Sequence, residues 1–509
     1  PLRHRAFFLA AGQLPEHTQE SDAMMAGLIV MRLVDKWPKP KSDIEVWTAR
    51  AGDFEPVEAH IAGLLDKPIA RALTAIVEAV KEYSRGNFDR RVPRLISYAQ
   101  FLEESEHWEP AADVYDTAVE LINQTGRDTE LLLICYAKSA QCVRKVGQLV
   151  RAHERLSAGI DVATNLKEEA TAAHRDYWLL RMRIDMAIVS AEILEQDREW
   201  ESAAEIYIGA IDLIKTRPPD KPQMLRCYER AAFCLRQIGQ IERAESVLDD
   251  GFAVALELQD MRWALYLRIS SAVVERQKGD LPEAEIQLDA IIEDAERANH
   301  IEMVARAKHE RGVVAYQRNQ DARAVELYYE AARTYTDPAM VRRALMDAAV
   351  ALADLGEALG DRRHLDYATK VCLWVRGAPD DGKEIRTIAA LNLMRNAALA
   401  NEPEKFQRLV DELKHEEMSG YWQTHYFLFV GQGLLRFGKR GAARDALEKA
   451  ISLAQRYHVN KLLVDTDRIL AATDDRPIVW LESEESPAIE ALFADIDAGR
   501  GVFAGATWS

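Results

Sequence analysis

The stretch AAFCLRQIGQIERAESVLDDG, residues 231–251, contains the pattern that decides the fold. Its key positions are a small residue, a large residue three further on, a turn-like QIGQ, and then a small, a large and a small residue: Ala232, Leu235, Ala244, Leu248 and Gly251. Intervals of three, four and seven residues keep side chains on one face of an α-helix. The stretch therefore predicts two helices joined by a turn, with small residues allowing a close approach and larger ones filling the adjoining gaps.

The same pattern recurs along the chain at intervals of about forty residues. Second helices of this kind begin around a leading alanine: Ala72, Ala111, Ala152, Ala203, Ala244, Ala324 and Ala443, with a variant at Ala284. Small residues stand twelve positions earlier: Ala99, Ala140, Ala191, Ala232, Ala272, Gly312 and Gly431. The segments between them are rich in turn residues: SEHWEP, KVGQ, QDREW, QIGQ, QKGDLP, QRNQD and FGKRG. The gap of about three periods before Ala443 predicts two degenerate repeats between Pro338 and Glu417.

This pattern resembles the tetratricopeptide repeat (TPR), in its long variant of about forty residues found in kinesin light chains and in bacterial peptide-sensing and signal-transducing regulators. The matching residues are the small position of the first helix and the Ala-x-x-x-Tyr/Leu-x-x-Ala of the second. The family's aromatic residue near the repeat start and its closing proline are mostly absent. The resemblance implies an all-α fold, a right-handed α-solenoid (superhelix) of about ten TPR-like helix-turn-helix repeats with extra capping helices.

Five segments follow from the register of the repeats. They are N-terminal non-repeat capping helices in 1–43, clear repeats in 44–335, degenerate repeats in 336–420, the last clear repeat in 421–471, and a linker with a C-terminal amphipathic helix and tail in 472–509. In the last segment one apolar stripe forms at positions i, i+3, i+4 and i+7: Ile489, Leu492, Phe493 and Ile496. This helix either folds back as a cap or is offered to a partner.

The stretch GQGLLRFGKRG, residues 431–441, has the Gly-x-x-x-x-Gly-Lys spacing of a phosphate-binding loop. The next residue is Arg440, where such a loop needs a hydroxyl for Mg²⁺, and no strand pattern precedes it. Gly431 and Leu434 instead occupy the small and large positions of the last repeat. HEEM at 415–418 lacks the second histidine of a zinc-binding helix. We therefore expect no enzyme, no cofactor and no metal site.

Composition limits the partners and the compartment. The formal net charge is −18, which argues against a nucleic-acid partner. Five cysteines without a Cys-x-x-Cys motif predict reduced, mostly buried thiols in a cytoplasmic protein. No apolar run reaches the length of a membrane span, so no membrane partner is expected. The opening PLRHRAFFLAAG has an apolar part at the short limit of a signal peptide, and we do not expect export.

The resemblance also implies where a ligand would bind, because in this family the first helix of each pair lines the inner, concave groove. The residues one, four and five after the small position then face a ligand. In the early repeats these include Gln141, Arg144 and Lys145, and Glu192, Glu195 and Gln196. Three later repeats place arginine or tyrosine before glutamine, and two further residues extend this face: Arg236, Gln237, Arg276, Gln277, Tyr316, Gln317, Arg306 and His309. Amides can bond a peptide backbone and arginine a carboxylate, although both residue types also suit an ordinary helix surface.

We therefore expect a non-enzymatic protein- or peptide-binding scaffold or sensor, a bacterial regulatory or assembly partner that acts through another chain. Two alternatives stay open. One is a homo-oligomeric structural adaptor that associates through its terminal helices. The other is an enzyme with a site in the groove near Arg306, His309 and Tyr316, which would require a buried histidine with an acidic neighbour.

Overall fold

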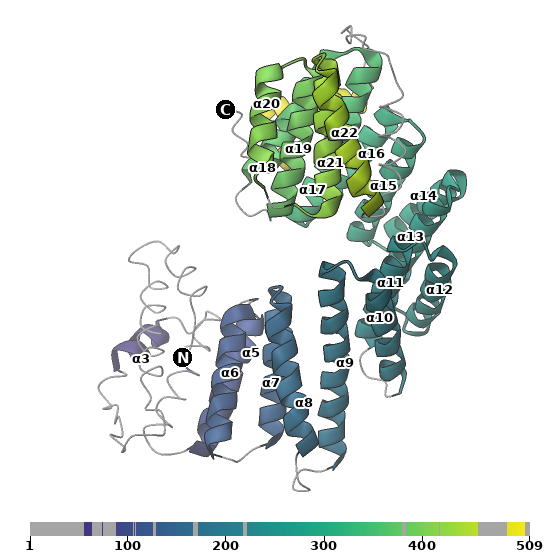
Figure 1. Cartoon of the computed structure of the whole chain (residues 1–509). Helices are drawn as coiled ribbons and strands as arrows, with labels where there is room; N and C mark the ends of the chain where they lie inside the picture. The colour runs from purple at the N-terminus through teal and green to yellow at the C-terminus, as the bar shows by residue number, and fades with distance from the viewer. Residues whose placement is uncertain are drawn as a thin grey trace. The chain divides into compact units, whose positions relative to one another are not determined.

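The computed structural model describes residues 55–63, 74, 88–104, 106, 108–125, 129–165, 172–216, 221–378, 383–416, 418–456 and 486–503. These residues form helices joined by turns and no strand, which confirms the predicted all-α class (Figure 1). Contacts divide the chain into two compact units, Pro1–Val247 and Leu248–Ser509. Helix α12 (Ile241–Glu257) crosses this division. The predicted N-terminal capping segment lies outside the described residues.

The described part of the first unit is a series of helices. They are α3 (Glu55–Ala62), α5 (Phe88–Glu104), α6 (Trp108–Thr125), α7 (Thr129–Lys145), α8 (Leu149–Asn165), α9 (Ala172–Gln196), α10 (Trp200–Lys215) and α11 (Lys221–Gln237). From α5 to α11 every helix contacts its successor, and α7 also contacts α9. Alternate helices thus lie beside one another, as expected where helix pairs stack as repeats.

The second unit continues the same arrangement. Its helices are α13 (Met261–Lys278), α14 (Leu281–Arg297), α15 (Ile301–Gln317), α16 (Asp321–Thr334), α17 (Pro338–Leu359), α18 (Arg362–Gly377), α19 (Lys383–Leu399), α20 (Pro403–Leu413), α21 (Gly420–Arg436), α22 (Arg440–Arg456) and α24 (Pro487–Ala498), followed by the 3-10 turn η2 (Gly501–Phe503). The alternate helices α13 and α15, α17 and α19, and α19 and α21 contact one another. Each unit is therefore an α-solenoid of TPR-like helix pairs.

The predicted turns are where the chain reverses. Each of the seven turn segments contains one residue with a positive φ angle: Glu106, Gly147, Arg198, Gly239, Gly279, Asn319 and Gly438. In the QIGQ turn, Gly239 has φ +75° and the amide of Gln240 donates to the carbonyl of Leu235 at 3.0 Å. The left-handed residue therefore ends the first helix by satisfying its last carbonyls, the usual role of such a residue at a helix C-terminus.

The small positions face the second helices, as the pattern predicts. A Cβ atom added to Gly312 would lie 2.7 Å from ring carbons of Tyr328, and one added to Gly431 would lie 2.5 Å from Cγ of Leu447. Tyr328 and Leu447 are the large residues four positions after the leading alanines of their repeats. Gly431 lies inside α21 and Lys439 is exposed in the following turn, so this stretch is a helix pair and not a phosphate-binding loop.

All five cysteines are buried, which leads to a first testable expectation. Burial raises the pKa of the Cys135, Cys227, Cys234 and Cys372 thiols to about 12, and burial with the nearby Glu103 raises the pKa of Cys142 further. Because the thiolate is the reactive form, we expect the native chain to show almost no reaction with Ellman's reagent at pH 8. The denatured chain should titrate five thiols. Rapid modification of the native chain would contradict this burial.

Candidate functional site

Polar side chains converge from three alternate helices of the first unit, α7, α9 and α11. They are Gln141 and Arg144 on α7, Asp185, Glu192 and Glu195 on α9, and Gln223, Arg226 and Arg230 on α11. Within each helix the spacings are three, four or seven residues, so the members of each set share one face. The acidic helix α9 lies between two helices that present amides and guanidinium groups.

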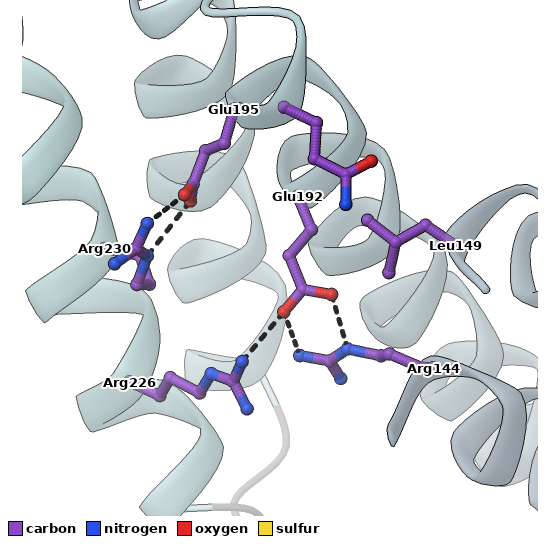
Figure 2. Close-up of a pocket in the computed structure, with 7 residues that line it drawn as sticks. Arg144, Leu149, Glu192, Glu195, Arg226 and Arg230 are labelled. Atoms are coloured by element: carbon purple, nitrogen blue, oxygen red, sulfur yellow. Dashed lines mark hydrogen bonds and ion pairs between the residues drawn. The ribbon is translucent and has the colours of Figure 1, made fainter. Parts of the chain in front are cut away.

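Glu192 is the centre of this arrangement (Figure 2). Arg144 donates to it through Nε and Nη2, both at 2.7 Å, in a two-pronged pair. Arg226 reaches the same carboxylate from α11, with Nη2 2.9 Å from Oε1. One carboxylate thus ties α7, α9 and α11 together. Paired hydrogen bonds between an arginine and a carboxylate are both stronger and more directional than single ones.

Two further contacts flank Glu192 along α9. On one side, Arg230 donates to Glu195 through Nε at 3.1 Å and also through Nη2. On the other side, Asp185 accepts from Gln141 of α7 at 3.2 Å and from Gln223 of α11 at 2.7 Å. Every carboxylate on this face of α9 is therefore held by at least one neighbouring helix.

A pocket of about 400 Å³ opens where these side chains meet. It is lined by Arg144, Leu149, Glu192, Glu195, Gln196, Arg226 and Arg230. Three guanidinium groups face two carboxylates, so the lining carries one excess positive charge. The side chain of Arg226 is 49% exposed, whereas those of Arg144 and Glu192 are 15% and 14% exposed. Arg226 is therefore the cation of this pocket that a ligand in solution reaches most easily.

The electrostatics keep the pocket ionised. Burial by itself would lower the pKa of the Arg144 guanidinium, but the hydrogen bonds and negative charge of Glu192 raise it above its usual value. The pKa of Arg230 is raised in the same way, against burial, by Glu195 and the nearby Glu229. Both arginines thus stay cationic at any physiological pH. A pocket of charged side chains with the exposed amide of Gln196 can bind an ion or a peptide.

Sequence reasoning found only part of this pocket. Arg144, Glu192, Glu195 and Gln196 are among the predicted groove positions of the early repeats, and the structure brings them together. Arg226 and Arg230 were not predicted, because they precede the small position Ala232 instead of following it. The signal was present in the sequence as helical periodicity, since continuing the three- and four-residue spacing from Phe233 towards the N-terminus reaches both arginines.

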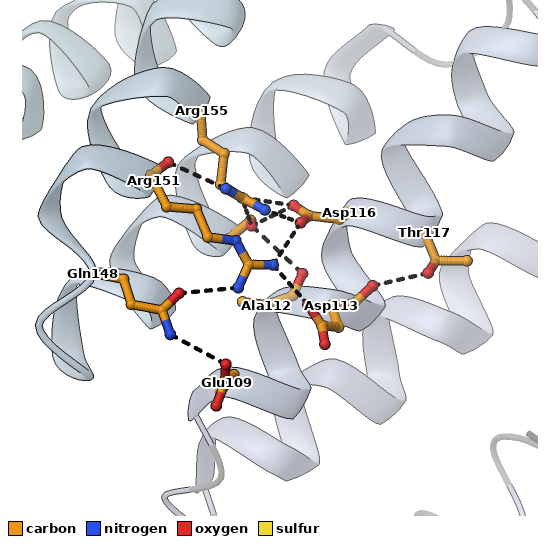
Figure 3. Close-up of polar contacts among 9 residues, drawn as sticks. Glu109, Ala112, Asp113, Asp116, Thr117, Gln148, Arg151 and Arg155 are labelled. Atoms are coloured by element: carbon orange, nitrogen blue, oxygen red, sulfur yellow. Dashed lines mark hydrogen bonds and ion pairs between the residues drawn. The ribbon is translucent and has the colours of Figure 1, made fainter. Parts of the chain in front are cut away.

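A second polar cluster in the first unit involves α6, α7 and α8 (Figure 3). Arg155 donates to Asp116 at 2.9 Å and to the hydroxyl of Ser139 at 2.7 Å, and Arg151 donates to Asp113 at 2.7 Å. Asp113 is 6% exposed, and its burial raises its pKa although Arg151 acts in the opposite direction. Ser139 is fully buried. This cluster fills the space between three helices, so we interpret it as a packing device.

Two of the eight predicted ligand residues lie in the first unit. Arg236 is half-buried near the end of α11, with its guanidinium carbon 5.7 Å from the centre of the Phe233 ring. Gln237, the last residue of α11, is exposed. Neither lines the pocket described above.

The other six predicted residues lie in the second unit, where four of them are on the surface shared by α13 and α15. Arg276 approaches Glu310 of α15 at 3.6 Å. Arg306 places its guanidinium carbon 4.9 Å from the centre of the Tyr266 ring of α13. Gln277 and Gln317 are exposed. The arginines are thus engaged within the unit, and the two glutamine amides are accessible to a ligand.

Tyr316 belongs to a network that links α15, α17 and α19. Its hydroxyl donates to Asp354 of α17 at 2.6 Å, and Arg395 of α19 donates to the same carboxylate. Burial, followed by the neighbouring Asp354, raises the pKa of Tyr316 well above its usual value. Like Glu192 in the first unit, Asp354 is an acidic residue on a middle helix that joins its two neighbours.

His309 does have the buried position and acidic neighbour that an enzymatic site would require. It is 6% exposed, its Nε2 lies 2.8 Å from Oδ2 of Asp347, and its Nδ1 lies 3.4 Å from the hydroxyl of Tyr335. Burial raises the pKa of the Tyr335 hydroxyl well above its usual value. His309 and Asp347 therefore meet the condition set for the enzymatic alternative, and that alternative stays open.

Two classes of site receive no support from the part of the chain that the structure describes. Its helices include none with the length and apolar character needed to cross a bilayer. Its His, Cys, Asp and Glu side chains form no group of three or more that could hold a metal ion.

Comparison with known proteins shows similarity at the level of solved structures. No protein-family model and no curated protein sequence matches the chain. The quorum sensor NprR from B. thuringiensis in its apo form is similar over 74% of this chain and 99% of that one, at 12% identity and a TM-score of 0.47. The Rap conjugation gene regulator of plasmid pLS20, in complex with the Phr* peptide, covers 73% and 97% at 10% identity and a TM-score of 0.44. TPR-like repeats of a putative kinesin light chain from Podosopora anserina cover 41% and 96% at 17% identity and a TM-score of 0.32. At these identities the similarity concerns the helical-repeat fold alone.

Proposed function

We propose that the chain is a non-enzymatic protein- or peptide-binding scaffold or sensor that acts through another chain in the cytoplasm. The observation that carries this proposal is the pocket of about 400 Å³ between α7, α9 and α11, lined by charged side chains from alternate helices. The pocket offers charged, amide and apolar groups to a ligand. Five buried thiols suit a reducing compartment.

The chemistry of the pocket indicates a ligand with a carboxylate. Arg226 makes a single hydrogen bond to Glu192 and keeps further donors for an acidic side chain or a peptide C-terminus. The exposed amide of Gln196 can bond a peptide backbone, and Leu149 offers an apolar contact. A short acidic peptide fits this combination of one exposed guanidinium group with donors to spare, one amide and one apolar side chain.

Binding at Arg226 would also act on the helices, which is what a sensor requires. Glu192 joins α9 to α7 through Arg144 and to α11 through Arg226. A ligand carboxylate that takes Arg226 removes one of the three polar connections described between α9 and α11, and it leaves Arg230–Glu195, Gln223–Asp185 and the pair with Arg144 intact. A ligand shifts a conformational equilibrium by its difference in affinity for the two arrangements. We therefore propose that the ligand controls the distance between α9 and α11.

The test is a panning experiment with a random peptide library displayed on phage. We expect acidic peptides to be selected by the full chain and to lose about 10- to 100-fold in affinity for the Arg226→Ala variant, the loss typical of a charged hydrogen bond. The matched control is Arg243→Ala, because Arg243 is 48% exposed and pairs with the exposed Glu205 outside the pocket. This control should bind as the wild type does.

Two other results would place the binding site elsewhere or contradict the proposal. Peptides that bind Arg226→Ala normally but fail with Arg236→Ala/Arg276→Ala/Gln317→Ala would move the site to the predicted arginine and glutamine ladder. Failure to select any peptide would contradict peptide binding. The structural-adaptor alternative predicts instead a stable homo-oligomer in analytical ultracentrifugation, with no dependence on Arg226.

A further inference from the structure

Within the second unit, the C-terminal helix α24 packs against a surface formed by α16 and α18, which we call the α16/α18 face. The apolar stripe predicted from the sequence is the face that it buries, together with one residue of η2: Ile489, Leu492, Phe493, Ile496 and Phe503 are each at most 3% exposed. Phe493 stacks on Tyr367 of α18 with ring centres 3.9 Å apart and planes 8° apart. Phe493 and the buried His364 also form an edge-to-face contact, with ring centres 5.6 Å apart.

Charge complementarity surrounds this apolar contact. On the α18 side, Lys370 donates to Asp497 at 2.5 Å, and Arg363 lies 3.4 Å from Glu490. The hydroxyl of Tyr367 also donates to Asp497. On the α16 side, the hydroxyl of Tyr329 donates to Asp495. The α16/α18 face thus presents cationic groups and hydroxyl donors to α24, and α24 presents carboxylates to that face.

Helix α24 is also a self-contained element. Ser486 caps its N-terminus by accepting from the amide of Ile489 at 3.3 Å, and Gly499 ends it in the left-handed conformation. Its main contacts are with α16, α18 and the following η2, and none of these contacts belongs to the packing of one repeat helix on the next. Residues 457–485 separate it from α22 along the chain. Helices α16 and α18 also pack on their chain neighbours α15, α17 and α19, so the repeat array has contacts of its own besides those with α24.

We infer that the α16/α18 face is a docking surface for an acidic amphipathic helix, which α24 fills in the isolated chain and a helix of a partner protein fills in its place. The partner helix carries apolar residues at i, i+3, i+4 and i+7, and carboxylates at i+1, i+6 and i+8, as α24 does from Ile489 onwards. Recognition of such a pattern by a groove is a recurrent mode of protein association. This surface is independent of the pocket in the first unit.

A labelled peptide of residues 486–503, SPAIEALFADIDAGRGVF, tests this inference on the full-length chain. In the variant Leu492→Asp/Phe493→Asp, α24 should no longer pack on the α16/α18 face, which leaves that face open. We expect the peptide to bind this open variant about 100-fold more tightly than the wild type, because a tethered helix competes at a high effective concentration. Adding Arg363→Glu/Lys370→Glu to the open variant should abolish binding. A peptide with the same two aspartate substitutions should not bind at all.

Three outcomes would overturn the inference. The first is an open variant with native circular dichroism that does not bind the peptide. The second is binding that is insensitive to the charge reversals at Arg363 and Lys370. The third is a concentration-dependent dimer of the wild type that is absent from the open variant, because the occupant would then be a second copy of this chain.

If the open variant does not fold, hydrogen exchange on the wild type tests whether α24 detaches from the α16/α18 face in the folded chain. We expect amides of α24 to exchange by local opening, about 100-fold or more faster than those of α17 in the interior of the same unit. Equal protection of α24 and α17 would show that the helix leaves only on global unfolding, and the surface would then be unavailable to a partner.

Discussion

Replacing Gly433 with alanine is expected to lower the free energy of unfolding of the second unit by about 1–3 kcal/mol, the usual cost of overpacking a core. An added Cβ atom would lie 2.3 Å and 2.5 Å from two ring carbons of Phe406. Phe406 is 1% exposed and belongs to the core cluster of this unit, so a shift of its ring would disturb neighbouring core side chains. The midpoint of urea denaturation, followed by circular dichroism, measures the effect.

Gly441 supplies the control from the same stretch of sequence. It is exposed near the start of α22, and a Cβ atom there would meet nothing within 4 Å. We expect Gly441→Ala to change the free energy of unfolding by less than about 0.5 kcal/mol, as surface substitutions usually do. Equal effects of the two substitutions would show that Gly433 is retained for some reason other than the close approach of Phe406.

The second large effect is expected for Glu192→Ala, which should destabilise the first unit by about 3 kcal/mol. Removing this carboxylate leaves Arg144, with a side chain only 15% exposed, without the acceptor of its two hydrogen bonds. An uncompensated buried charge is costly because it has lost both its water and its counter-ion. The same substitution releases Arg226. Urea denaturation gives the stability, and the phage-selected peptides give the affinity.

The matched control is Glu205→Ala. Glu205 also pairs with an arginine, Arg243, but the two side chains are 55% and 48% exposed. Exposed pairs of this kind contribute about 0–1 kcal/mol, so the substitution should have little effect. If Glu192→Ala proves as mild as Glu205→Ala, the carboxylate at position 192 is not the connection between α7, α9 and α11 that we describe.

The fold could be predicted from the sequence because its signals are local. A small residue such as Gly431, a large one at Leu447 and a turn at Gly438 lie within one helix pair, and the structure places them in the predicted relationship. The apparent phosphate-binding loop could be rejected on the same grounds. These features depend on spacing along one helix or across one turn, and such spacing can be read directly from the residues.

The candidate site could be predicted only in part. Arg144 and Glu192 were expected to face a groove, but their partnership joins residues on helices of different repeats. Arg226 joins the same carboxylate from a third helix. His309 and Tyr316 were expected as ligand groups, whereas Asp347 and Asp354 occupy them within the unit. The sequence shows that a charged residue lies on a helix face, but it does not show whether the partner of that residue is a ligand or a neighbouring helix.

The sequence by itself determined that this chain is a series of helix pairs, where each pair turns, and which face of its last helix is apolar. Helical periodicity and the left-handed conformation that favours glycine are properties of short segments, so they need no knowledge of the rest of the fold. Only the tertiary structure decided that Arg144, Arg226 and Glu192 share a pocket, and that the C-terminal helix lies on α16 and α18. Those contacts join segments about forty to more than one hundred residues apart, and they exist only after the repeats have stacked.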